Sequence, residues 1–375
     1  MPPTGHAVLS ASSAERWIQC PPSALLNAVS EDKGSVYAEE GTAAHALCEA
    51  KVLRALGRSE EPDPHDDTYY DETMEECAEA YKDYILDEVA KANCPEVFIE
   101  QHVDFSAYVP EGFGTCDCII ISDDSLHIVD FKYGKGVEVA AENNAQLLCY
   151  ALGAVAMFSD LYEINTVILT IFQPRKSHID SWDISREDLE GWATSLLAPK
   201  AALAIKGEGD FCAGDHCRFC RVRNTCRARA EYNLELAKYD FKMPPELTLQ
   251  EIEIILDRSA QTKAWLDDIE SYALEQALSG VTFERYKVVE GRSNRRYRDE
   301  QKAAELVLAA GFDPYKPQEI RGLTDMEKVV GKKKLTELIG DLIYKPRGKP
   351  VLVSVSDKRP AYISDAAEDF KEGKV

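Results

Sequence analysis

The sequence lacks the marks of an exported or membrane-spanning chain. Its start, MPPTGHAVLSASSAERW, has no basic stretch followed by an apolar one, and no later segment approaches about 18 uninterrupted apolar residues. It also lacks internal repeats and low-complexity tracts, and its 45% hydrophobic and 29% charged residues exclude wholesale disorder. We therefore expect a cytoplasmic globular protein. At 375 residues the chain is long enough for two domains or one elaborated domain.

Basic residues are scarce. The 43 Lys and Arg face 66 Asp and Glu, which gives a formal net charge of −23. Such a balance argues against nonspecific adhesion to nucleic acid over the whole surface. The charge is uneven, however, because residues 281–360 carry 18 Lys and Arg against 12 Asp and Glu. This part of the chain can therefore still bind a polyanion.

Periodicity and turn signals predict the order of the elements. Helices are expected at 12–29, 41–57, 72–92, 141–158, 185–205, 227–238 and 248–279, and strands at 96–105, 116–122, 126–132 and 165–174. This order favours an α/β fold with a mixed central sheet flanked by helices. The double proline in KMPPEL suggests a domain boundary, so we expect one domain over 1–240 and a second, basic α+β module over 241–375.

Two acidic residues and a lysine interrupt neighbouring apolar runs. The turn at Asp123 and Asp124 makes those runs a hairpin, in which antiparallel pairing brings Asp117 beside Asp130. Two facing carboxylates repel each other unless a cation lies between them, and oxygen ligands suit Mg²⁺ or Mn²⁺. Lys132 follows Asp130 by two residues and therefore shares its face.

This combination is what hydrolysis of a phosphodiester requires. A lysine beside metal-held carboxylates can orient or deprotonate a water, while the metal stabilises charge on a phosphorus-centred transition state. For a lone Asp-x-Lys the alternative is a solvated hairpin rim. Two further features favour the site: Gln146 and Tyr150 share a helix face at i and i+4, and His45 is a candidate metal ligand. Each of these alone also fits ordinary helix packing.

The ordered series resembles a known family. His45, then Gly114 to Asp117, then Asp130-Phe131-Lys132, then Gln146-x-x-x-Tyr150 is similar to the RecB-like branch of the PD-(D/E)XK nuclease superfamily. The resemblance covers residues 20 to 230 and implies the restriction-endonuclease-like core of that superfamily.

The resemblance also implies a ligand set. His45, Asp117, Asp130 and the main-chain carbonyl of Phe131 would hold the metal ion. One departure from the family pattern is that Cys116 stands where the superfamily's name has proline, which leaves the carboxylate in place.

Catalytic roles and partners follow from the same resemblance. Lys132 would serve the attacking water, and Gln146 and Tyr150 would position Lys132 or the DNA backbone. The implied activity is a DNA exonuclease acting on single- or double-stranded ends in phage recombination or replication, in the cytoplasm of a bacterial host. Phage single-strand-binding or recombination proteins are candidate partners, a homo-oligomer is compatible, and no membrane is involved. The alternative is a module that binds single-stranded DNA or a replication partner without cutting.

Eleven cysteines in a chain without an export signal should mostly be thiols. Six lie in or at the edges of expected helices and strands, where a free cysteine is usually a small buried hydrophobe. These are Cys48, Cys77, Cys94, Cys116, Cys118 and Cys149.

The remaining cysteines suggest a metal centre. The spacing Cys217-x2-Cys220-x5-Cys226 contains one Cys-x2-Cys pair, whereas a zinc ribbon needs two. Zinc bound through Cys212 or His216 remains an alternative.

The family resemblance implies a 4Fe-4S cluster in place of zinc. Its ligands would be Cys20, Cys217, Cys220 and Cys226, which pins the two ends of the nuclease domain together and leaves Cys212 over. Five arginines surround these cysteines and could meet phosphates: Arg218, Arg221, Arg223, Arg227 and Arg229.

The C-terminal third gives weaker signals. Residues 281–298 interleave aromatics with Arg and Lys, which suits stacking on bases but also an amphipathic hairpin. Residues 326–343 are expected to be helical and 344–363 extended. Together with the opening SSAERWIQCPPS and the ending SDKRPA, this tail resembles a phage-encoded group within the RecB-like nucleases.

Overall fold

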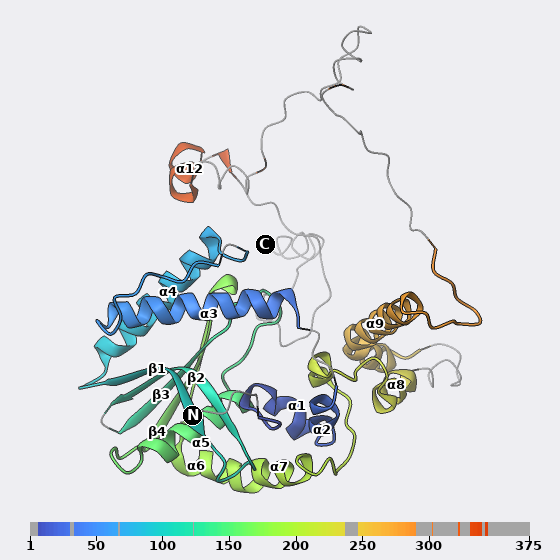
Figure 1. Ribbon diagram of the computed structural model, residues 1–375, viewed down its shortest axis with the longest axis horizontal. Coiled ribbons are helices and arrows are strands. Elements are labelled where there is room, and N and C mark those ends of the chain that lie inside the picture. The colour runs from blue at the N-terminus through green and yellow to red at the C-terminus, as the bar shows by residue number, and fades with distance from the viewer. Residues whose placement is uncertain are drawn as a thin grey trace, which may run out of the picture. The chain divides into compact units, whose positions relative to one another are not determined.

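A five-stranded mixed sheet forms the centre of the fold (Figure 1). The computed structural model describes residues 7–30, 34–66, 68–122, 124–236, 247–289, 302, 322, 331–339 and 342–343. The strands are β1 (Glu96–Asp104), β2 (Phe113–Ser122), β3 (Ser125–Phe131), β4 (Thr166–Gln173) and β5 (His178–Ser185). They lie side by side in chain order, with β3 and β4 parallel and the other pairs antiparallel. The expected α/β class and mixed sheet are confirmed.

Helices cover both faces of the sheet (Figure 1). On one face lie α3 (Val36–Ala55) and α4 (Glu72–Lys91), whose apolar side chains share a core with Val129 and Phe131 of β3. On the other face lies α5 (Ala145–Phe158), which is the crossover between the parallel strands β3 and β4. Its core includes the alternate residues Leu126 and Ile128 of β3. Because both faces are buried, β3 is mostly apolar, and His127 and Asp130 are its buried polar residues.

The first predicted helix is divided in the structure. Residues 12–29 form η1 (Ala11–Ser13), α1 (Ala14–Gln19) and α2 (Ser23–Ala28). Pro21 and Pro22 interrupt the run, since proline supplies no N–H to continue a helix. The helix predicted at 41–57 begins earlier, at Val36, where the Ser35 side chain accepts a hydrogen bond from the Ala38 N–H.

Strand β5 was missed by the sequence analysis. Its residues alternate strictly between half-buried and exposed, as expected for an edge strand with one face in water. The long helix predicted at 185–205 follows directly as α6 (Arg186–Trp192), a π-helical turn over Ala193–Leu197 and α7 (Ala198–Ala204). Pro199, which lacks an N–H, lies just after the π turn.

Two further helices complete this part of the chain. After η2 (Pro174–Lys176) and η4 (Asp215–Phe219) come α8 (Arg227–Leu234) and α9 (Leu249–Leu278). The α9 boundaries agree with the prediction, and a capping box between Thr248 and Glu251 fixes its start. Asp268 of α9 pairs with Arg229 of α8, which joins the two helices.

The chain divides into two compact units, Met1–Val289 and Glu290–Val375. Compactness does not define functional modules, so the predicted division at 240/241 stays a prediction. In the second unit the structure describes α12 (Lys332–Ile339), which lies inside the helix predicted at 326–343. Residues 281–289 form no helix or strand, while 290–298 and the extended segment predicted at 344–363 lie outside the described residues. None of the described helices is long and apolar enough to cross a bilayer.

Candidate active site and cysteine pocket

The hairpin places Asp117 at the end of the β2–β3 ladder. The last residue pair of the ladder is Cys118 with Val129, so Asp117 lies one residue beyond it. The Asp117 Oδ2 atom accepts a hydrogen bond of 2.7 Å from the Phe131 N–H. The carboxylate therefore takes the place of the next main-chain partner and is fixed by it.

Three possible metal ligands converge at this point. His45 Nδ1 of α3 lies 3.3 Å from Asp117 Oδ1. Glu100 of β1 completes the group, in which one ligand atom from each of the three residues lies within 4.8 Å of the others. Of the described residues, these alone form such a group. The prediction thus paired His45 with Asp117 correctly in space, but it missed Glu100.

Glu100 lies opposite Asp117 in the β1–β2 register. Its φ of 48° is left-handed, and this facing pair is absent from the ladder although the pairs on either side, Ile99–Cys118 and Gln101–Cys116, keep the same register. A non-glycine residue with such a φ is uncommon and marks strain that the surrounding structure maintains. In the sequence, Glu100 is one of several polar residues of this strand, so its charge alone does not mark it as a ligand.

Asp130 and Lys132 form a second set beside the first. Asp130 is 2% exposed, and its Oδ2 lies 2.8 Å from Lys132 Nζ. That contact is an ion pair without hydrogen-bond geometry, so Oδ2 has no hydrogen-bond partner among the described residues. A buried carboxylate oxygen in this condition is costly unless a cation or water satisfies it. The predicted roles of Asp130 and of the Phe131 carbonyl as metal ligands stay predictions.

Gln146 connects this second set to α5. Its Oε1 accepts a hydrogen bond of 3.0 Å from Lys132 Nζ, and its Nε2 donates to Asp130 Oδ1 at 3.0 Å and to the Tyr150 hydroxyl at 3.0 Å. The side-chain oxygen of Asn144 accepts hydrogen bonds from the first N–H groups of α5 and fixes where the helix begins. The predicted i, i+4 pair therefore meets the lysine as expected.

The pKa shifts show an excess of negative charge. Burial, and then the nearby Asp117, raise the pKa of Glu100 to about 7. Burial likewise raises the pKa of Asp130, and Asp117 adds to this while Lys132 opposes it. Burial acts to lower the pKa of Lys132, but Asp130 and Asp117 outweigh it, so the pKa is raised and the amine is an ammonium ion. Three carboxylates thus face one ammonium and one imidazole.

This arrangement fits a divalent cation. Two carboxylates and an imidazole within ligand distance of one another are a donor set that Mg²⁺ or Mn²⁺ accepts. A cation would relieve the repulsion between Glu100 and Asp117, whereas Asp130 already has Lys132 as its ion-pair partner. The residues present therefore fit the predicted metal.

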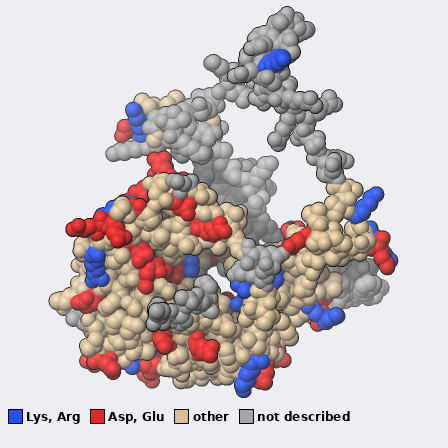
Figure 2. Space-filling view, in the orientation of Figure 1, with Lys and Arg blue, Asp and Glu red and all other residues tan. Residues whose placement is uncertain are grey.

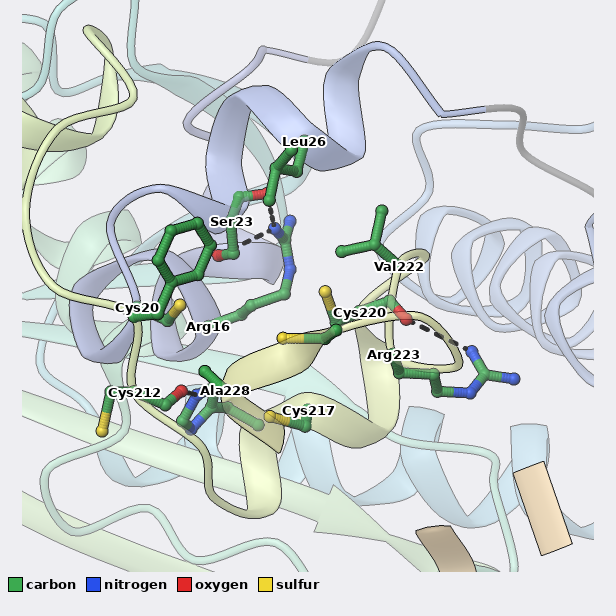
Figure 3. A pocket seen from close by; sticks show the side chains of 13 residues that line it. Arg16, Cys20, Ser23, Leu26, Cys212, Cys217, Cys220, Val222, Arg223 and Ala228 are labelled. Atoms are coloured by element: carbon green, nitrogen blue, oxygen red, sulfur yellow. Dashed lines mark hydrogen bonds between the residues drawn. The ribbon is translucent and has the colours of Figure 1, made fainter. Parts of the chain in front are cut away.

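The predicted cysteine ligands line one pocket, although nearly 200 residues separate Cys20 from the others. Figure 3 shows the sulfur atoms of Cys20, Cys217 and Cys220 directed towards the same space, whereas that of Cys212 points away from it. Cys226 lines the same pocket from the start of α8. The pocket thus gathers the four cysteines that the resemblance implies as ligands.

Donor groups surround these sulfurs. Asn27 Nδ2 donates to Cys220 Sγ at 3.3 Å, and its Oδ1 accepts from the Arg221 N–H at 2.8 Å. The buried guanidinium of Arg16 lines the pocket and donates to the Ser23 carbonyl at 2.8 Å. Hydrogen bonds to sulfur of this kind also occur around metal-bound cysteines.

The spacing of the sulfurs bears on which metal fits. A single zinc ion with sulfur ligands at about 2.3 Å brings those sulfurs to about 3.8 Å from one another. Among the described residues, no three of these sulfurs lie within 4.8 Å of one another. His216, the other zinc candidate, bonds through Nε2 to the Cys212 carbonyl at 2.9 Å. The choice between zinc and an iron-sulfur cluster stays a prediction.

The other six cysteines take no part in either site. Cys48, Cys77, Cys116, Cys118 and Cys149 are buried, and Cys94 is exposed. Burial raises the pKa values of Cys118 and Cys149 far above the usual range, so these thiols are inert.

Three of the five arginines near the cysteines have internal partners. Arg223 and Arg229 both pair with Asp268 of α9, and Arg221 donates to the main-chain carbonyls of Asn27 and Ser30. Their expected role as phosphate contacts is therefore replaced in this structure by contacts that hold the cysteine-rich loop in place.

Fold and site together define a mixed α/β protein with a partly buried cluster of acidic residues and a histidine contributed by β1, β2 and α3. The family described as "Protein of unknown function (DUF2800)" matches residues 6–360, and the chain belongs to that family. Among solved structures, the crystal structure of SSO0001 is similar to it, with 15% sequence identity and a TM-score of 0.25, over 57% of this chain and 96% of that one.

Proposed function

We propose that this chain is a Mg²⁺- or Mn²⁺-dependent DNA nuclease with a RecB-like PD-(D/E)XK core. One observation carries the proposal: His45, Glu100 and Asp117 converge within 4.8 Å, beside an Asp130–Lys132 pair at 2.8 Å. The resemblance of the ordered motifs supports DNA as the substrate and end processing in phage recombination or replication as its setting.

The side chains of the proposed nuclease site have separate roles. His45, Glu100 and Asp117 would hold the ion, with Asp130 and the Phe131 carbonyl as the further ligands that the resemblance implies. The ion, when bound, supplies Lewis-acid stabilisation of charge at phosphorus. Lys132, held by Asp130 and Gln146, would orient or deprotonate the attacking water. Gln146 fixes the Lys132 amine, and the Tyr150 hydroxyl fixes the Gln146 amide.

We further propose that Cys20, Cys217, Cys220 and Cys226 hold a 4Fe-4S cluster that ties the N-terminal helices to the cysteine-rich loop. Burial of three of these cysteines and the convergence of all four on one pocket support a metal centre, and the resemblance favours an iron-sulfur cluster over zinc. No redox step is assigned to the cluster; its role is structural.

Digestion of end-labelled DNA tests the nuclease. Single and double strands are incubated with Mn²⁺ or Mg²⁺ and with wild type, Asp130→Ala or Lys132→Ala. Wild type should cut and both variants should not, while Glu96→Gln, an exposed carboxyl change on β1, should cut as wild type does. Activity that survives both changes contradicts the assignment. Wild type that binds DNA without cutting it points to the non-cutting binding module instead.

A matched pair of cysteine variants tests the cluster. Protein purified without oxygen should be brown, with absorbance at about 400 nm. Cys20→Ser should lose this absorbance and unfold at a lower temperature, whereas Cys212→Ser, whose sulfur points out of the pocket, should retain both properties. One zinc and no iron per chain in wild type would favour the zinc alternative.

A further inference from the structure

One aromatic side chain stands out on the cysteine-rich loop. Phe219 is 76% exposed, although Cys217 and Cys220 on either side of it are only 9% and 7% exposed. The turn is rigid, because the Cys220 N–H donates to the Cys217 carbonyl at 3.1 Å and the flanking side chains are anchored in the pocket. The ring is therefore held out in water by a fixed support, at a cost in hydrophobic free energy.

Positive charge lies on both sides of this ring in the sequence. Arg218 precedes it and Arg227 begins α8, and both are exposed. Unlike Arg223 and Arg229, which share Asp268, neither has a carboxylate partner among the residues described. Figure 2 shows Asp and Glu spread over α3, α4 and the sheet, while Lys and Arg gather near α8. The cysteine-rich loop thus offers an aromatic face and unneutralised guanidinium groups on an otherwise acidic surface.

We infer that Phe219 is a stacking platform for an unpaired base and that Arg218 and Arg227 hold the adjoining phosphates of a single DNA strand. This inference rests on the proposed function and narrows its substrate to DNA with an unpaired segment. Single-strand binding sites combine the same two elements, aromatic side chains for the bases and basic groups for the backbone. In a duplex the base faces are covered by their neighbours, so an exposed ring gains nothing there.

Binding measured in EDTA tests the inference without requiring cleavage. Fluorescence anisotropy is followed with a labelled oligonucleotide, single-stranded or annealed to its complement. Replacing the ring by an aliphatic side chain, Phe219→Leu, should weaken single-strand binding about 5- to 150-fold, as expected for one lost base stack. Duplex binding should not change, and Phe219→Trp should restore single-strand binding. Leu161→Ala, a change at an apolar residue that is 79% exposed elsewhere, serves as the matched control.

The salt dependence of binding tests the role of Arg218 separately. Removing one phosphate contact by Arg218→Gln should reduce the salt dependence of single-strand binding by about 0.7 in the slope of log K against log salt. Lys91→Gln, which removes an exposed charge at the end of α4, should leave that slope unchanged.

Three results would overturn the inference: no single-strand binding by wild type, equal binding by Phe219→Leu, or an equal loss on single and double strands. Absorbance at about 400 nm in Phe219→Leu shows that the cysteine-rich loop is intact. A chain that binds through Phe219 but never cuts refutes the proposed nuclease alone. Conversely, a chain that cuts but binds equally well without the ring refutes the stacking platform alone.

Discussion

Two polar clusters are buried in the same sheet, and they differ in how their charges are balanced. In one, His127 Nε2, Thr170 Oγ1 and Ser181 Oγ form a chain of hydrogen bonds of 2.8 Å each across β3, β4 and β5. In the other, the pair Asp130–Lys132 stands beside further carboxylates, and one Asp130 oxygen lacks a hydrogen-bond partner among the described residues. The first cluster is satisfied by the protein itself, and the second is not.

This difference in charge balance distinguishes a structural hydrogen-bond network from a functional site. Burial lowers the pKa of His127 to about 4, so that cluster is neutral and complete at physiological pH. Burial and Asp117 raise the pKa of Glu100 to about 7, so the acidic cluster gains stability only when a cation arrives. Changes in the first cluster should therefore affect stability, and changes in the second should affect activity.

The largest effect is expected from Asp130→Asn. The amide keeps the shape of the carboxylate but not its charge, so the charge balance around Lys132 and the ion is lost. We expect hydrolysis to fall by about 10³-fold, with an unchanged circular dichroism spectrum. Asp183→Asn, an exposed change on β5, should act as wild type does. If Asp130→Asn loses activity because it unfolds, the acidic cluster affects stability as the His127 cluster does, which contradicts the prediction.

The stability that the His127–Thr170–Ser181 cluster contributes should depend on pH. His127 faces Glu88, Asp183 and Lys91, and its pKa in the folded protein lies below the unfolded value of 6.5. The unfolded chain therefore binds the proton first, so stability is complete above pH 6.5 and is lost as the pH falls to about 4. The loss is about 3 kcal/mol. Urea midpoints of wild type and His127→Asn should converge at low pH, whereas an exposed change, His65→Gln, should leave the profile as it is.

Thr170→Val tests the same cluster without titration. Thr170 is fully buried and bonds to both His127 and Ser181, so removing its hydroxyl leaves the buried His127 short of a hydrogen bond, while the exposed Ser181 can bond to water. We expect a cost of about 1–3 kcal/mol in the free energy of unfolding, with unchanged hydrolysis. Thr166→Val is the control on the same strand, because the Thr166 hydroxyl has no hydrogen bond among the described residues. Equal urea midpoints for the two variants would show that the network contributes nothing.

The smallest effect is expected from Glu100→Gln. Loss of one carboxylate ligand should raise the Mn²⁺ concentration for half-maximal hydrolysis about 10-fold. At pH 8, above the pKa of about 7, the metal-free variant should be more stable than wild type, because an unfavourable ionised carboxylate has been removed. An unchanged Mn²⁺ requirement would remove Glu100 from the ligand set.

Local pattern was enough to predict much of the fold and part of the site. The hairpin of β2 and β3 places Asp117 next to the strand that carries Asp130 and Lys132, and helical spacing places Gln146 with Tyr150. These predictions rest on the periods of strands and helices, which tertiary packing did not override.

What the sequence could not show depends on distortion and on solvent exposure. Glu100 joins the acidic cluster because the β1–β2 register sets it opposite Asp117, at a point where the β1 backbone adopts a φ of 48°, and the sequence shows neither the register nor the distortion. Strand β5 was missed because half of its side chains face water, which weakens the apolar signal of a strand. Arg223 and Arg229 pair with Asp268 of α9, about 40 residues further along the chain, and no local sequence pattern predicts this contact.

Anomalous diffraction from crystals soaked in Mn²⁺ tests the central claim most directly. We expect one strong anomalous difference peak bonded to His45, Glu100 and Asp117, and we expect this peak to be lost in crystals of Asp117→Asn. Crystals with no peak at these residues, or with an equal peak in the variant, would contradict it.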